Sequence, residues 1–138
     1  MSSLSIRVGD QATLTRTVSA ADVRAFADLT GDRNPVHLDA AFAAQTRFGR
    51  PIAHGMLCGG LISAVLGTQL PGPGALYLQQ TLQFKAPTFV GDSIIVLVTV
   101  VAVREDKPVV TLRTECRDQD GKVLVEGEAV LLVPGDAP

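Results

Sequence analysis

The sequence has few cysteines and no basic run, and each shortage excludes a class of protein. Its 138 residues contain two cysteines, Cys58 and Cys116, which are too few for a disulfide framework. Both lie in apolar stretches, so we expect buried, reduced thiols in a cytosolic protein. With 12 Lys and Arg against 14 Asp and Glu, the net charge is −2. This near-neutral balance argues against electrostatic binding of nucleic acid.

The chain also lacks a hydrophobic run long enough for a transmembrane helix. The longest wholly apolar runs are Ile94–Val98 and Val100–Val103. Even joined across Thr99, they fall far short of the roughly 20 residues that a spanning helix needs. The first residues, Met1–Arg7, lack the basic and apolar regions of a signal peptide. The sequence therefore predicts a soluble, cytoplasmic protein with no membrane partner.

What the sequence does contain is enough apolar material for one folded unit. Hydrophobic residues make up 46% of the chain, which argues against a disordered tail and allows a core without disulfides. At this length we expect residues 1–138 to form one domain.

The N-terminal part alternates short elements with turn residues. Gln11–Val18 predicts a strand, and Ser19 is a typical N-cap for a following helix that ends at Gly31. Asp32–Val36 predicts a turn, because Asp, Asn and Pro are ordinary turn residues. Asp39–Gln45 predicts a second short helix.

The middle of the chain predicts a buried helix. Gly55–Leu70 is apolar nearly all round, which is typical of a helix covered on every side. Gly59 and Gly60 lower its helix propensity, so we expect them to allow close packing of the backbone against a neighbouring element. The run Pro71–Gly74 ends the helix.

The remaining sequence predicts an antiparallel meander. Strand, helices, buried helix and meander together predict an α+β domain whose sheet wraps around one central helix. The strand within the meander that runs from residue 93 to 103 is too continuously apolar for a solvated face, which favours a homodimer over a curled sheet alone. Asp120-Gly121 is a hairpin signal between the last two of four strand candidates, which are Tyr77–Lys85, Ser93–Val103, Val109–Arg117 and Lys122–Val133.

Two features of the sequence have the residue types that acid–base chemistry needs. Asp32 and His37 flank a tight turn that can bring a carboxylate and an imidazole to one spot, where they could hold and deprotonate water. The plainer alternative is a turn with no chemical role. Only His37 and His54 are available for any histidine-dependent reaction.

Gly55 is the second candidate, because it starts the predicted buried helix. The first N–H groups of a helix have no intrahelical partners, and with the helix dipole they suit a developing oxyanion. Glycine also lets a substrate approach the backbone closely. The alternative is an ordinary glycine at a tight helix start.

Residues 26–43 resemble the signature of (R)-specific enoyl-CoA hydratases in the MaoC-like hydratase/dehydratase family. The resemblance extends through Ile52–Met56 and through Phe84–Pro87 followed by Gly91-Asp92, so it covers most of the chain. The first motif matches, with the family's spacing, at Phe26, Leu29, Thr30, Gly31, Asp32, Asn34, Pro35, Val36, His37 and Ala43.

This resemblance implies a hot-dog fold, with an antiparallel sheet wrapped around a long central helix and two subunits paired. It implies reversible syn hydration of trans-2-enoyl-CoA to (R)-3-hydroxyacyl-CoA, so the expected partner is an acyl-CoA thioester and no further cofactor is expected. It also implies that Asp32 and His37 are the catalytic pair and that Gly55 supplies a backbone N–H to the thioester oxygen. Asn34 and Ser63 are expected to support the site.

The sequence also offers candidate residues for binding the two ends of the substrate, the CoA phosphates and the acyl chain. Arg47, Arg50 and Lys85 are candidates for contacts with CoA phosphates, although exposed Lys and Arg are ordinary surface residues. The acyl chain is expected to lie along the helix residues Leu57, Leu61, Ile62 and Leu66 and parts of the strands.

A metal site is not expected. His37, His54 and a nearby Asp match no known zinc arrangement in spacing or residue type. A calcium loop starting at Asp32-x-Asn34 would need glycine at its sixth position, where His37 stands. We expect His54 to be a structural residue at the helix start that hydrogen-bonds the backbone.

Two rival functions remain open. Thioesterases and acyl-carrier-protein dehydratases with this fold typically carry a carboxylate on the central helix, whereas Met56–Leu70 contains no Asp or Glu. A non-catalytic acyl-CoA binder would have no reason to keep Asp32 together with His37. Loss of enoyl thioester absorbance without thiol release would identify hydration, and thiol release would identify a thioesterase.

Overall fold

The computed structural model describes residues 5–133. Residues 1–4, on which part of the signal-peptide prediction rests, lie outside the described range, as do residues 134–138. One strand and three short helices come first, and a longer helix then precedes four consecutive strands. In chain order these are β1 (Gln11–Thr17), α1 (Ala20–Thr30), α2 (Pro35–Leu38), α3 (Ala40–Ala44), α4 (Gly55–Thr68), β2 (Leu76–Phe84), β3 (Ser93–Val103), β4 (Val109–Arg117) and β5 (Val123–Leu132).

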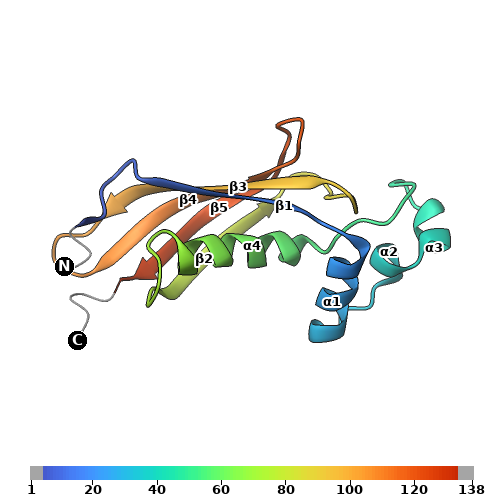
Figure 1. The fold of residues 1–138 in the computed structure, drawn as a ribbon, viewed down its shortest axis with the longest axis horizontal. Helices are drawn as coiled ribbons and strands as arrows, with labels where there is room; N and C mark the ends of the chain where they lie inside the picture. The colour runs from blue at the N-terminus through green and yellow to red at the C-terminus, as the bar shows by residue number, and fades with distance from the viewer. Residues whose placement is uncertain (1–4, 134–138) are drawn as a thin grey trace.

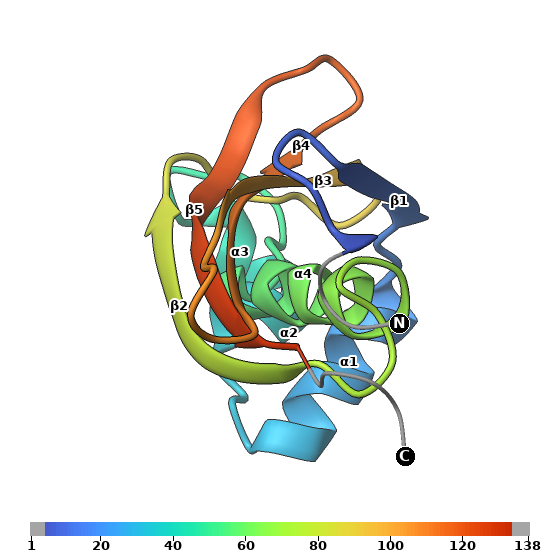
Figure 2. The same ribbon diagram turned by 90° about the vertical axis from the view of Figure 1, so that its left-hand side faces the viewer.

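The strands form one antiparallel sheet in the order β1-β3-β4-β5-β2. Figure 1 shows α4 lying along one face of this sheet, with α1, α2 and α3 gathered beyond one end of α4. Seen end-on in Figure 2, the sheet curls around α4. The predicted α+β class is therefore confirmed, and a sheet curled around a central helix is the arrangement of the hot-dog fold.

The start and end of α1 follow the predicted signals. The Ser19 side chain accepts a hydrogen bond from the Asp22 N–H at 3.1 Å, and the Asp22 carboxylate accepts one from the Ser19 N–H at 3.0 Å. This reciprocal capping box satisfies two donors that a helix start would leave unpaired. Gly31 ends the helix with φ of 81°, the left-handed conformation that glycine adopts without strain.

The turn predicted for residues 32–36 is wrong in its second half, because a short helix begins there. Asn34 caps α2 by accepting a hydrogen bond from the Val36 N–H at 3.2 Å, and Pro35 occupies the first helical position. Proline suits that position because the first N–H of a helix has no intrahelical partner. The chain therefore reaches His37 in helical rather than turn conformation.

The prediction that α4 is buried on every side is also wrong for the single chain. Its core side consists of Cys58, Ile62, Val65 and Leu66, while Met56 on the other side is 56% exposed. An apolar pattern indicates that a helix surface is buried, but it does not indicate whether the same chain or a second chain buries it. The helix covers the sheet with one face and leaves its other face open.

Close packing explains one of the two mid-helix glycines. A Cβ on Gly59 would lie 3.2 Å from the Leu82 side chain on β2, whereas a Cβ on Gly60 would meet no atom within 4 Å. The expectation of close backbone approach is thus confirmed for Gly59 and wrong for Gly60. Gly59 lets α4 approach β2, the strand that carries Phe84 beside Gly55.

The core lies between α4 and the concave face of the sheet. Alternate residues of β3 point into it, while Ile95 and Val101 on the same strand are exposed. Cys58 and Cys116 are buried free thiols, as predicted. Within residues 5–133, no helix has the length and apolar character needed to cross a membrane.

Candidate active site

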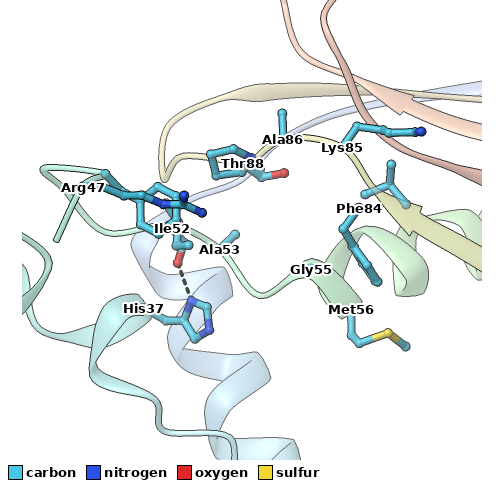
Figure 3. Close-up of a pocket in the computed structure, with 13 residues that line it drawn as sticks. His37, Arg47, Ile52, Ala53, Gly55, Met56, Phe84, Lys85, Ala86 and Thr88 are labelled. Atoms are coloured by element: carbon cyan, nitrogen blue, oxygen red, sulfur yellow. Dashed lines mark hydrogen bonds between the residues drawn. The ribbon is translucent and has the colours of Figure 1, made fainter.

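The imidazole of His37 is held in a defined tautomer by a backbone carbonyl. His37 lies in α2 and is half-buried, and its Nδ1 is 2.7 Å from the Ile52 carbonyl oxygen (Figure 3). A carbonyl only accepts, so Nδ1 carries the proton and donates it. Nε2 therefore keeps its lone pair and is available as a proton acceptor.

Asp32 lies beside this imidazole on the exposed loop between α1 and α2. Its N–H donates to the Thr30 hydroxyl at 3.1 Å, and its carboxylate accepts a longer bond from the Asn34 N–H at 3.3 Å. A carboxylate oxygen of Asp32 and a ring nitrogen of each histidine all lie within 4.8 Å of one another. The structure thus brings Asp32 and His37 together, at the distance that one shared water can bridge.

His54 completes this cluster from the start of α4. Its Nε2 is 2.9 Å from the backbone carbonyl of Asp32, and its ring centroid is 3.9 Å from that of His37. The expectation that His54 hydrogen-bonds the backbone is confirmed. The contact also ties the Asp32 loop to the start of α4.

A cavity of about 480 Å³ opens beside the His37 ring. In Figure 3, His37 borders it on one side and Phe84 and Met56 border it on the other. Gly55 is the first residue of α4, and no acceptor for its N–H is found among the described residues. The cavity therefore has a proton acceptor at one wall and a free backbone donor at another.

Phe84 explains why residue 55 has no side chain. A Cβ on Gly55 would lie 2.8 Å from two carbons of the Phe84 ring, closer than van der Waals contact allows. The ring lies against the helix start at the cavity wall. Glycine thus lets the ring and the first turn of α4 approach each other while leaving the N–H uncovered by a side chain.

Burial lowers the pKa of His37 below its ordinary value of 6.5. The bond to Ile52 raises the pKa, the nearby His54 lowers it, and the Asp32 carboxylate raises it, with burial the largest of these effects. Burial has this sign because the charged imidazolium loses hydration. At neutral pH the ring is therefore unprotonated at Nε2, as a general base must be.

The supporting residues predicted from the sequence fall in different places. Asn34 caps α2 and bonds to the Asp32 carboxylate through its N–H, so it shapes the loop. Ser63 lies eight residues after Gly55 on α4, about 12 Å further along the axis. The structure does not bring Ser63 to the Asp32–His37 pair of its own chain.

The predicted acyl-binding residues divide into two groups. Leu57 and Leu61 line a second cavity of about 260 Å³ between α1, β1 and α4. Ile62 and Leu66 are 0% and 1% exposed, belong to the core and line neither of these two cavities, so their contact with the acyl chain stays a prediction. Both point to the sheet, because the face of α4 that packs on β3 and β4 is the one that carries them.

Two of the three basic candidates border the larger cavity. Arg47 and Lys85 line it, and the Lys85 ammonium is 3.7 Å from Glu126. Arg50 instead places its guanidinium 4.1 Å from the centre of the Phe89 ring. Two cationic side chains therefore line the cavity, and one of them, Lys85, is paired with a carboxylate.

Asp32, His37 and His54 have the residue types of a metal site and the required proximity. Each histidine, however, already donates one ring N–H to a backbone carbonyl, which leaves one nitrogen per ring. The remaining nitrogen of His54 is fully buried. A metal ion bound to both rings would have to reach the buried Nδ1 of His54.

Sequence reasoning missed two contributors to this site. Ile52 acts through its carbonyl, and a backbone group at a distance of 15 residues leaves no signal in the side-chain pattern. Phe84 was recognised only as part of the motif Phe84–Pro87, while its contact with Gly55 depends on the pairing of β2 against α4.

The sequence matches the family model described as a MaoC-like domain over residues 7–119. It is 54% identical over 134 residues to the (R)-specific enoyl-CoA hydratase of Aeromonas caviae, covering 97% of this chain and all of that protein. It is 50% identical over 129 residues to the enzyme of the same name from Rhodospirillum rubrum, covering 94% and 89%. The fold superposes on an unliganded R-hydratase from Pseudomonas aeruginosa with a TM-score of 0.94 and 45% identity, covering 98% and 86%.

The protonation of His37 is directly measurable because the chain has only two histidines. We expect NMR titration of the imidazole C–H signals to give His37 a pKa below 6.5, because burial disfavours the imidazolium. Asp32→Asn should lower this pKa further, since the carboxylate raises it. A value above 6.5, or a rise in Asp32→Asn, would contradict the geometry described.

Proposed function

The chain belongs to the MaoC-like domain family, and from this membership we propose that it is an (R)-specific enoyl-CoA hydratase with Asp32 and His37 as its catalytic pair. It is a hydro-lyase that adds water reversibly to trans-2-enoyl-CoA, giving (R)-3-hydroxyacyl-CoA. One observation supports the residue assignment above all. The proton-accepting Nε2 of His37 and the free N–H of Gly55 belong to walls of one cavity.

The reaction places two demands on this cavity. As water adds to C3 of the enoyl group, negative charge develops on the thioester oxygen. The Gly55 N–H, aligned with the positive end of the α4 dipole, stabilises that charge. Because the charge is larger in the transition state than in the substrate, a fixed donor there lowers the barrier.

The Asp32–His37 pair supplies the proton transfers. We assign the removal of a water proton to His37 Nε2, because Nδ1 is committed to the Ile52 carbonyl. The Asp32 carboxylate holds the same water through its other O–H. The hydroxyl then bonds to C3 while the pair returns one proton to C2, so H and OH add from one face.

The substrate itself carries the activating group, so we propose that the enzyme uses no metal or further cofactor. Arg47 and Lys85 at the cavity mouth have the charge to hold the phosphates of coenzyme A. The two buried free thiols support a reducing compartment, and we place the enzyme in the cytoplasm.

We also propose that two copies pair through the edge strand β2 and the open face of α4. Leu76 and Leu78 on β2 are 59% and 52% exposed, and Met56 on α4 is 56% exposed. An unpaired edge strand with apolar side chains is a template for another chain. A second copy would cover the face of α4 that its own sheet leaves open.

The catalytic assignment predicts that Asp32→Asn and His37→Gln each lower kcat by about 10²–10⁴-fold, the usual contribution of a general acid–base group. The measurement is the loss of enoyl thioester absorbance with crotonyl-CoA, together with a thiol assay. Asp28→Asn is the matched control, because Asp28 is an exposed carboxylate paired only with Arg33 at 2.6 Å. Variants as fast as the parent would disprove the assignment, and thiol release by the parent would identify a thioesterase.

Removal of divalent metals should leave the reaction unchanged. Dialysis against EDTA followed by assay in metal-free buffer is expected to preserve kcat, since protons move between water, His37 and Asp32 without a metal-bound hydroxide. Loss of activity that added zinc restores would instead show that the histidine cluster holds an ion.

The pairing proposal predicts a particle of twice the chain mass of 14.5 kDa in sedimentation equilibrium. Leu78→Glu should shift the equilibrium towards monomer, because it places an unpaired charge in the interface. Val101→Glu, on the exposed side of β3, is the control and should leave the mass unchanged. A parent protein that sediments as a monomer would refute the pairing.

A further inference from the structure

His54 is the most deeply buried charged or polar group near the site, yet it does not line the substrate cavity. It is 2% exposed, and its ring lies between Phe26 of α1, at 4.6 Å, and His37 of α2, at 3.9 Å. It stands immediately before α4 as the N-cap residue, but its side chain makes no capping bond. Its contacts are thus directed at two other helices rather than at its own.

The hydrogen bonds of His54 fix its tautomer. Nε2 lies 2.9 Å from the Asp32 carbonyl oxygen, which can only accept, so Nε2 carries the proton. Nδ1 is then a lone-pair acceptor, and it is fully buried with no hydrogen-bond partner among the described residues. Leaving a buried acceptor unpaired destabilises the folded state. An apolar ring at this position would avoid that cost, so packing alone does not explain a histidine here.

What a histidine supplies, and an apolar ring does not, is the donor to Asp32. Asp32 is exposed and follows Gly31, which is in the left-handed conformation. A Cβ added at Gly31 would meet no atom within 4 Å, so this part of the loop is not held by packing. The loop's other bonds to Asp32 are local, from Asn34 at 3.3 Å and to Thr30 at 3.1 Å. The His54 bond is the long-range attachment of Asp32, across 22 residues.

The same segment also holds the other member of the pair. The Ile52 carbonyl accepts the bond from His37 Nδ1, and His54, two residues later, donates to Asp32. The segment itself is anchored to the loop before β3, because the Ala53 N–H donates to the Thr88 carbonyl at 2.7 Å. Residues 52–54 therefore hold both Asp32 and His37 by hydrogen bonds, and the position of this segment sets the distance between the two side chains.

We infer that His54 is a positioning residue, which holds the Asp32 backbone through its Nε2–H and supports the His37 ring through its face, so that both catalytic groups meet one water. This inference rests on the proposed hydratase function. His54 touches neither substrate nor water in this role and acts only through Asp32 and His37.

Two substitutions separate the donor from the ring. His54→Phe keeps an aromatic ring against Phe26 and His37 and removes both the donor and the unpaired Nδ1. His54→Gln gives up the ring but places an amide N–H at nearly the reach of Nε2. A role in packing alone predicts that Phe is the milder change, whereas positioning through the donor predicts that Gln is.

With crotonyl-CoA, we expect His54→Phe to lower kcat by about 10–100-fold, the usual effect of slight misplacement of a catalytic group. KM should change little, because His54 does not line the cavity. His54→Gln should retain kcat within about tenfold of the parent, since a hydrogen-bond donor to Asp32 remains. Thermal unfolding of each variant, followed by circular dichroism, shows whether the comparison is between folded proteins.

A folded His54→Phe variant with the parent's kcat would overturn the inference, and so would a folded His54→Gln variant slower than His54→Phe. If His54→Phe does not fold, the Gln variant decides alone: a loss above about 100-fold in a folded Gln protein contradicts positioning by the donor. The parent assayed in parallel separates the two proposals. A parent that hydrates no enoyl-CoA refutes the proposed function, whereas an active parent with an equally active Phe variant refutes only the role of His54.

A readout without substrate completes the test. In His54→Phe/Asp32→Asn, His37 is the sole histidine, and its NMR titration should lie at higher pH than that of His37 in Asp32→Asn, because the neighbouring His54 lowers the pKa of His37 and the Asp32 carboxylate is absent from both proteins. Burial of His37 is kept by the phenyl ring, so the change isolates the lost imidazole. An unchanged titration would show that the two rings are not in the contact described and would overturn the inference.

Discussion

The hydrogen bond from His37 Nδ1 to the Ile52 carbonyl is the interaction on which the proposed chemistry of this molecule depends. At 2.7 Å it fixes which ring nitrogen carries the proton, and it turns the other nitrogen into a base. Without it, either tautomer would be available and the ring could rotate about its side-chain bonds. A backbone carbonyl suits this task because the strand-like segment that carries it is itself fixed, by the Ala53–Thr88 bond and the bridge between Ile52 and Phe89.

The fold supplies what this bond requires. The curled sheet holds α4 along its length, so the start of the helix, Gly55, has a fixed place at one end of the sheet. The residues just before that start, 52–54, then reach across to α2 and to the loop after α1. The start of α4 thus has two functions in the proposed site. Gly55 lines the cavity with its free N–H, and residues 52–54 hold Asp32 and His37.

The sequence predicted most of the elements of the fold, because their signals were local, but the predicted meander is wrong for β2, which pairs with β5 rather than β3. The bounds of β3 and β4 agree with the prediction to the residue, since each strand contains β-branched residues and is bordered by turn residues. The helix α2 was missed because Asn34 and Pro35 are typical both of turns and of helix starts. The cover of α4 and the placement of Ile62 and Leu66 depend on which face meets the sheet, and a pattern that is apolar all round carries no such information. Likewise, Asp32, His37 and Gly55 could be selected by motif, whereas the bonds across 15 and 22 residues that arrange them could not.

Burial increases from Asp32 through His37 to His54, and this order agrees with the roles proposed for the three residues. Asp32 is exposed and meets water directly, His37 is half-buried, and His54 is closed off from solvent. A histidine base must be buried enough to stay unprotonated and accessible enough to contact its water. Of the three positions, only that of His37 satisfies both conditions. In the proposed mechanism the exposed Asp32 carboxylate holds the water, while the buried His54 ring donates its Nε2–H to the Asp32 carbonyl. An imidazole at the exposed position of Asp32 would therefore be protonated more readily, and one at the buried position of His54 would not reach the substrate water.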